Sequence, residues 1–96
     1  MRVELAKFFI AGLQYSEAHQ LKLYSGEYLR LQEETDNSSD AFAIAIYKAQ
    51  EKLGYVPRAF NREIYNQLDQ LEIVVEEYFD EAPPWERVLV SIFIEE

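Results

Sequence analysis

One stretch near the middle of the chain, residues 41–48, limits the folds that the sequence can adopt. Small and large apolar side chains alternate there, so an extended segment would have an alanine face opposite a face of larger side chains. Because both faces are apolar, we expect an interior strand covered on both sides, with room for another element to approach the alanine face. The two faces consist of Ala41, Ala43 and Ala45 against Phe42, Ile44 and Ile46.

Five further segments are predicted to be strands, because they are rich in apolar side chains or alternate apolar with polar ones. In chain order they are residues 3–11, 27–34, 53–56, 71–79 and 87–94. Gly12 is expected to end or bend the first strand, and Gly54 to mark a bulge or a close backbone approach. In the segment 71–79, the period of two places Ile73, Val75 and Phe79 inward.

One helix is predicted at about residues 58–71. Phe60, Ile64, Leu68 and Leu71 recur at spacings of four, four and three, which places them on one helical face. Pro57 suits the first turn of such a helix. A shorter capped helical turn is expected at residues 16–19.

These elements predict a mostly β, α+β domain: a small OB-like barrel of about six strands with one main helix. A closed or partly open barrel fits, because closure removes the strand edges that a sheet in a 96-residue chain could not otherwise cover. We expect residues 1–96 to form a single domain. No apolar run approaches the length of a membrane span, and no signal peptide is expected at the start. The absence of cysteine excludes disulfides and thiolate metal sites, and it fits a cytoplasmic location.

The charge of −9 is unevenly distributed. Residues 69–96 contain nine acids and one base, whereas residues 1–68 contain nine acids and eight bases. Within residues 48–62, four bases (Lys48, Lys52, Arg58 and Arg62) accompany one acid. The overall charge argues against non-specific binding of polyanions, but the local excess leaves room for one small basic site.

The sequence gives no support for catalysis or for a bound cofactor. It has no phosphate-binding loop, no nucleophile-elbow spacing and no His-Glu metal motif. His19 is the single histidine, and without cysteine it has no partners for a zinc or triad site. We therefore expect neither an enzyme nor a metal protein.

A polar turn, the alanine-rich strand and a Gly-Tyr step together resemble the HIRAN domain family. The matching residues are Asp36-Asn37-x-x-Asp40-x-x-Ala43-Ile44-x-Ile46, Leu53-Gly54-Tyr55-Val56-Pro57-Arg58, Ile10-Ala11-Gly12-Leu13-Gln14-Tyr15 and Leu29-x-Leu31-x-Glu33. The resemblance covers about residues 9–71 and implies a compact OB-like barrel. It also implies a module that binds single-stranded DNA at a free 3′ end, and in eukaryotic members this module accompanies helicase-like ATPases.

The resemblance implies a nucleic-acid site made of six positions. At the family's arginine-tyrosine pair this chain has Gln14 and Tyr15, and at its tyrosine-aspartate pair it has Ser39 and Asp40. Tyr55 stands where the family has histidine, and Arg58 where it has lysine.

From these positions we expect Tyr15 and Tyr55 to stack on bases and Asp40 to accept from the terminal hydroxyl. Arg58 would hold a phosphate, and Arg62, one helical turn later, shares its face.

Each of these side chains also has a plainer interpretation. Asp36, Asn37 and Asp40 are typical of a turn whose side chains accept backbone N–H groups. Tyrosines on small barrels are commonly half-buried, and charged side chains near a helix start are commonly just solvated. A different function therefore stays open: a protein-interaction or self-associating module whose acidic residues 69–96 and strand edges bind a protein or another copy of the chain.

Overall fold

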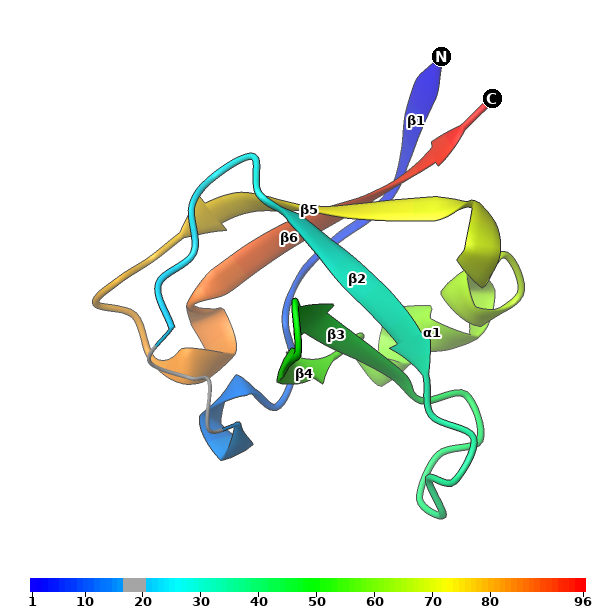
Figure 1. The fold of residues 1–96 in the computed structure, drawn as a ribbon, viewed down its shortest axis with the longest axis horizontal. Helices are drawn as coiled ribbons and strands as arrows, with labels where there is room; N and C mark the ends of the chain where they lie inside the picture. The colour runs from blue at the N-terminus through cyan, green and yellow to red at the C-terminus, as the bar shows by residue number, and fades with distance from the viewer. Residues whose placement is uncertain (17–20) are drawn as a thin grey trace.

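The computed structural model describes residues 1–16 and 21–96, and these form a six-stranded antiparallel sheet with one α-helix (Figure 1). The expected helical turn at residues 16–19 falls outside the described residues except for Ser16. Three short 3₁₀ turns, labelled η, connect the other elements. In chain order the elements are β1 (Arg2–Phe9), η1 (Leu13–Tyr15), β2 (Tyr28–Glu33), β3 (Ile44–Lys48), β4 (Glu51–Tyr55), α1 (Arg58–Tyr65), η2 (Leu68–Gln70), β5 (Leu71–Tyr78), η3 (Pro84–Glu86) and β6 (Val88–Glu95).

The strands follow the order β1-β6-β5-β2-β3-β4, so β1 and β4 are the two edges of the sheet. The sheet curls until these edges meet through one antiparallel bridge, in which Ala11 and Tyr55 exchange backbone hydrogen bonds of 2.8 and 2.9 Å. The fold is therefore the predicted OB-like barrel in its partly open form, because a single bridge and not a continuous ladder joins the two edges.

Gly54 makes this bridge sterically feasible. A Cβ atom at Gly54 would lie 2.3 Å from the carbonyl oxygen of Ala11 and 2.8 Å from Cγ2 of Ile10. The β3–β4 register also shifts next to Gly54, between Ile46 and Tyr47. Both features predicted for this glycine, a bulge and a close backbone approach, are confirmed.

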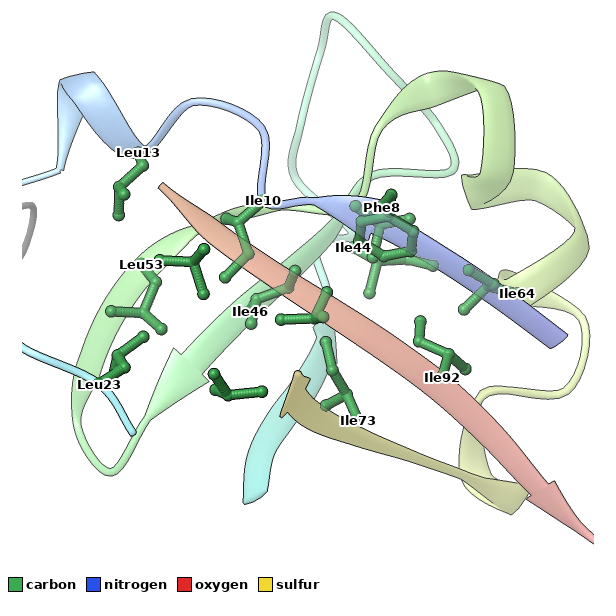
Figure 2. Packing of buried hydrophobic residues seen from close by; sticks show 14 residues of the cluster. Phe8, Ile10, Leu13, Leu23, Ile44, Ile46, Leu53, Ile64, Ile73 and Ile92 are labelled. Atoms are coloured by element: carbon green, nitrogen blue, oxygen red, sulfur yellow. The ribbon is translucent and has the colours of Figure 1, made fainter. Parts of the chain in front are cut away.

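The core lies inside the curled sheet and is built from aliphatic side chains of nearly every element (Figure 2). Ile44 and Ile46 of β3 and Ala45 between them are completely buried, which confirms the interior strand with two apolar faces. The fully buried large side chains are Ile10, Leu13, Leu23, Ile44, Ile46, Leu53, Ile64, Ile73, Val75, Val88, Val90 and Ile92. Helix α1 covers one opening of this core, and its Phe60 stacks on Phe8 of β1 with ring centroids 5.3 Å apart.

The predicted helix 58–71 is too long. Helix α1 ends at Tyr65, and after Asn66 the chain makes the 3₁₀ turn η2 and enters β5 at Leu71. The backbone N–H of Gln67 bonds the carbonyl of Ile64 in a tighter i−3 pattern that terminates the helix. Leu68 and Leu71 still pack against the core, so the apolar spacing was a burial signal and not a helix signal at this end.

Two strand predictions also need correction. Residues 41–43 are not in a strand: Ala43 donates its backbone N–H to the carbonyl of Asp40 in a turn, and β3 begins at Ile44. Phe79 does not point inward and is 37% exposed. A register shift between Val75 and Glu77 interrupts the period of two, so Tyr78 packs against the core in its place.

The two ends of the described chain lie side by side, because β1 and β6 run together as a ribbon that projects from the barrel (Figure 1). The amino group of Met1 donates to the backbone carbonyl of Glu96 at 2.8 Å. Among the described residues, no helix is long and apolar enough to cross a membrane.

Candidate functional site

The turn before β3 is organised by its own polar side chains. Oδ1 of Asn37 accepts the backbone N–H groups of Ser39 at 2.9 Å and Asp40 at 3.1 Å. Oδ1 of Asp40 accepts the N–H of Phe42 at 2.9 Å. The turn interpretation drawn from the sequence is confirmed for Asn37 and Asp40, and these bonds fix the position of the Asp40 carboxylate.

The second oxygen of that carboxylate faces helix α1. Oδ2 of Asp40 accepts from the side-chain amide of Asn61 at 2.8 Å and lies 3.6 Å from Nε of Arg58. Nη2 of Arg58 donates to the backbone carbonyl of Ser39 at 3.0 Å. Turn and helix start are thus joined, and three of the predicted site residues (Ser39, Asp40 and Arg58) lie together.

Asn61 holds this arrangement from inside and was missed by the sequence analysis. It is 5% exposed, which is unusual for an amide side chain that lies three residues before the buried Ile64. The detectable signal was a polar residue on the buried side of a short amphipathic helix.

Tyr55 is fixed by a different polar network. Its hydroxyl contacts both carboxylate oxygens of Glu34, at 2.9 and 3.1 Å, and Nζ of Lys52 bonds both Glu34 and this hydroxyl. Asn37 adds a further hydrogen bond to Glu34 at 3.1 Å. The network therefore ties the ring of Tyr55 to β2, β4 and the turn.

The pKa values of the charged pair reflect these bonds. Partial burial tends to raise the pKa of Glu34, but hydrogen bonds from Lys52, Tyr55 and Asn37 outweigh burial and hold it below the ordinary value. Partial burial likewise tends to lower the pKa of Lys52, but its bonds to Glu34 and Tyr55 raise it well above its ordinary value. Both side chains are therefore charged at neutral pH.

Three adjoining hollows surround these side chains. The first hollow, about 360 Å³, lies between η1 and β4. The second, about 240 Å³, lies between the turn and the start of α1, and it shares Tyr55 with the first. The third, about 440 Å³, lies along α1 and shares Asp40 and Arg58 with the second.

Their linings place an aromatic ring and a cation in each hollow. The first is lined by Gly12, Tyr15, Ser16, Glu51, Lys52, Leu53, Gly54 and Tyr55. The second is lined by Ala11, Asn37, Ser39, Asp40, Ala43, Tyr55, Val56, Pro57 and Arg58, and the third by Asp40, Phe42, Arg58, Ala59, Asn61 and Arg62. Six of the seven predicted site residues are thus brought to one continuous surface.

Gln14 is the seventh, and it is exposed on η1 without lining any of the three hollows. Its neighbour Tyr15 is 87% exposed, so its ring is open to solvent. The turn η3 contacts η1 and adds Trp85, which is 56% exposed. Trp85 was not anticipated, because no local pattern shows that a residue so far along the chain lies near η1.

The basic cluster expected at residues 48–62 is smaller than the sequence indicated. Lys48 forms an ion pair with Glu27, and Lys52 forms one with Glu34, both with acids from the neighbourhood of β2. Arg58 is paired with Asp40 but is 74% exposed along its side chain. Among residues 1–16 and 21–96, Arg62 has no carboxylate within ion-pair distance, so Arg58 and Arg62 carry the accessible positive charge.

The acids of residues 69–96 lie on η2, on β5 and the loop that follows it, on η3 and at the C-terminal end of β6. Eight of the nine acids in residues 69–96 are exposed, and Glu76 is half-buried with a 2.7 Å bond from Ser91. Within the part of the chain that the structure describes, no group of three His, Cys, Asp or Glu side chains is arranged to hold a metal ion.

Comparison with known proteins identifies a matching family and two similar structures. Residues 3–96 match the model of the HIRAN domain. A protein from Lactobacillus plantarum of known crystal structure is similar with a TM-score of 0.78 and 25% identity, over 98% of this chain and 95% of that chain. The HIRAN domain of human HLTF is similar with a TM-score of 0.68 and 17% identity, over 99% of this chain and 81% of that chain. A search of curated protein sequences found no significant match.

Proposed function

The chain belongs to the HIRAN domain family, and on that premise we propose that it recognises the free 3′ end of single-stranded DNA. It acts as a binding module and not as an enzyme, and stalled or damaged DNA that exposes such an end is its target. The family is associated with DNA binding, which supports the nucleic-acid part of this proposal.

The observation that carries the proposal is the composition of the second hollow. A carboxylate, a guanidinium and an aromatic ring, from three separate segments, line a space of about 240 Å³. A strand end offers the matching groups: a hydroxyl donor, a phosphate and a base. We therefore assign Asp40 to the terminal hydroxyl, Arg58 to the phosphate and Tyr55 to a base close to the end.

Asp40 accepts a hydrogen bond from the 3′ hydroxyl in this scheme. The carboxylate is held in place by Asn61 and by the N–H of Phe42, so it is oriented before a ligand arrives. A 3′-phosphate would bring negative charge against this carboxylate, which gives a physical reason for preferring a free hydroxyl.

Arg58 holds the adjacent phosphate. Its Nε and Nη2 atoms face Asp40 and Ser39, and Nη1 has no acceptor among the described residues. Charge-assisted bonds from a guanidinium to phosphate are among the stronger polar contacts that proteins make.

Tyr55 and Tyr15 supply stacking surfaces along the strand, from the second hollow into the first. The hydroxyl of Tyr55 is occupied by Glu34 and Lys52, so its ring and not its hydroxyl is offered to the ligand. Base stacking on such rings contributes about 1–3 kcal/mol per base. At position 14 the family's cation is replaced by the amide of Gln14. At position 39 the family's aromatic ring is absent, and Ser39 contributes its backbone carbonyl, which accepts a hydrogen bond from Arg58.

A second candidate function is favoured by the exposed acids on β5, η3 and β6. An acidic surface of this kind suits a basic protein partner, and the free edge of β1 could pair with a strand of that partner or of a second copy of the chain. In this case the three hollows would be solvated surface without nucleic-acid affinity.

Fluorescence anisotropy at low salt separates the two. A labelled single strand with a 3′ hydroxyl is compared with the same strand ending in a 3′-phosphate and with a blunt duplex. We expect the hydroxyl strand to bind best, with an affinity that falls as salt rises by a slope near −0.7 per phosphate contact.

Two variants assign the end-binding residues. Arg58→Ala should weaken binding about tenfold, and Asp40→Asn should narrow the difference between the hydroxyl and phosphate strands. Arg2→Ala is the matched control, since Arg2 lies over Phe93 on the projecting ribbon away from the hollows. Absence of binding at tens of micromolar would reject the proposal and direct attention to protein partners of the acidic side.

A further inference from the structure

A short stack of side chains stands beside the second hollow. Phe42, just before β3, meets the ring of Tyr65 edge-on, with centroids 5.4 Å apart and an interplanar angle of 87°. The guanidinium carbon of Arg62 lies 4.6 Å from the centroid of Phe42. Phe42 and Tyr65 are half-buried whereas Arg62 is exposed, so the guanidinium rests on a supported ring and remains accessible to solvent.

Phe42 and Arg62 of this stack line the third hollow, which adjoins the place assigned to the strand end. Asp40 and Arg58 line both the second and the third hollow. A terminal sugar bonded to Asp40 would therefore lie between two further spaces. The first hollow, of about 360 Å³, is reached past Tyr55, and the third hollow, of about 440 Å³, lies on the Arg62 side. The rest of the strand occupies the first of these, which leaves the third hollow for the last base.

We propose that the third hollow is the subsite for the terminal nucleobase, which stacks on Arg62. The inference rests on the proposed function. Ser39 stands where the family has a tyrosine and has no ring to stack on a base, so we assign that stacking role to Arg62. Along the strand, the last base lies on Arg62, the last phosphate on Arg58, and the preceding bases on Tyr55 and Tyr15.

The chemistry of arginine supports this placement. A guanidinium is planar and weakly hydrated, and it stacks on aromatic and nucleobase faces, whereas a lysine ammonium is a hydrated point charge. Phe42 on one side restricts the motion of Arg62, so less freedom is lost when a base covers it. Its charge, unpaired within residues 1–16 and 21–96, also attracts the strand.

The test removes the last base from the DNA strand and the guanidinium of Arg62 from the protein. Anisotropy is measured for the intact strand and for a strand whose last nucleotide is abasic but keeps its sugar, phosphate and 3′ hydroxyl. We expect the wild-type chain to bind the abasic strand about 5- to 50-fold more weakly. Arg62→Lys should bind the intact strand more weakly by a similar factor and show no further loss on the abasic strand.

Two controls make this result specific. Arg30→Lys changes another exposed arginine that lies 4.6 Å from a ring centroid, that of Tyr47, but lines none of the hollows, and it should behave as the wild type. The salt slope should be unchanged in Arg62→Lys, because lysine keeps the charge. Unfolding curves of both variants verify that the fold is retained.

The outcomes distinguish this inference from the proposed function. Binding that depends on the 3′ hydroxyl but not on the last base, or equal affinities of Arg62→Lys and the wild type, would overturn the inference alone. The same holds if Arg62→Gln weakens both strands equally and lowers the salt slope by about 0.7, since Arg62 would then be a phosphate contact. Failure of the wild type to bind any strand would reject both.

Discussion

Two tyrosines line the first hollow, and the protein holds them in opposite ways. Tyr55 ends β4 at the bridge that joins the sheet edges, and its hydroxyl is tied to Glu34 and Lys52. Tyr15 ends the three-residue turn η1 and is 87% exposed. One ring is built into the barrel, and the other is displayed on its surface.

The two tyrosine rings are suited to different tasks: a fixed ring positions a ligand, and an exposed ring adapts to it. A ring that is fixed before the ligand arrives loses little freedom on binding, so Tyr55 suits a base close to the strand end, where geometry must discriminate. A free ring adapts to successive bases of any sequence, so Tyr15 suits the strand beyond the end. Substitutions near Tyr55 should therefore alter stability and binding together, whereas substitutions at Tyr15 should alter binding alone.

The largest effect should come from the close approach beneath Tyr55. Gly54→Ala places a Cβ atom 2.3 Å from the carbonyl oxygen of Ala11, so the bridge must open or the strands must shift. We expect a loss of about 3 kcal/mol in the free energy of unfolding, measured by urea denaturation.

Gly26→Ala is the control for this change. Gly26 has a φ of +90°, but nothing lies within 4 Å of an added Cβ, so its cost should be only about 1 kcal/mol of backbone strain. Equal losses for the two variants would show that the bridge does not constrain β4.

A smaller effect should follow from the network that anchors Tyr55. The pKa of Glu34 is lower in the folded chain than its ordinary 4.5, so its contribution to stability is present above that pH and disappears as the pH falls through the lower folded pKa. Lys52 is partly exposed and solvent screens the pair, so Glu34→Gln should cost only about 1 kcal/mol at pH 7.

The pH profile gives the sharper result. The free energies of unfolding of the wild type and Glu34→Gln should converge as the pH falls through the lowered folded-state pKa of Glu34, because the wild-type carboxylate then becomes protonated. Glu63→Gln, an exposed acid on α1, should leave the profile unchanged. A constant difference between wild type and Glu34→Gln at all pH values would mean that packing and not charge anchors the ring.

The smallest effect on stability should be that of Tyr15→Ala. Because the ring is exposed, we expect the free energy of unfolding to change by less than about 0.5 kcal/mol. Affinity for single-stranded DNA should nevertheless fall, by about 5-fold or more. Tyr15→Phe keeps a stacking ring and should bind normally; a loss there as large as in Tyr15→Ala would assign the role to the hydroxyl.

The sequence predicted the elements of this fold better than their limits. Alternation in β2, β3 and β6 was sufficient to identify strands, and Gly54 indicated a close approach without naming its partner. The end of α1 and the orientation of Phe79 depend on a 3₁₀ turn and on a register shift. Neither has a local signature. Burial of Leu68 and Leu71 is compatible with helix or strand, and the register shift in β5 depends on its pairing with β6.

The site was predictable where residues are close in sequence and hidden where pairing brings them together. The turn side chains and Arg58 could be identified from a motif. Glu34 reaches Tyr55 only because β2 and β4 both pair with β3. Lys48 and Lys52, counted in the local excess of bases, are paired with acids from other segments. Long-range register, which composition does not encode, determines those partners.

The ribbon of β1 and β6 has a practical consequence for how this barrel can be attached to other molecules. Because residues 1 and 96 lie side by side, while the turn before β3 is at the opposite end in Figure 1, both ends can be anchored at one point without covering the hollows. Such a unit can be inserted into a loop of a host protein or circularly permuted with a short linker, and its ligand-facing end would still project outward.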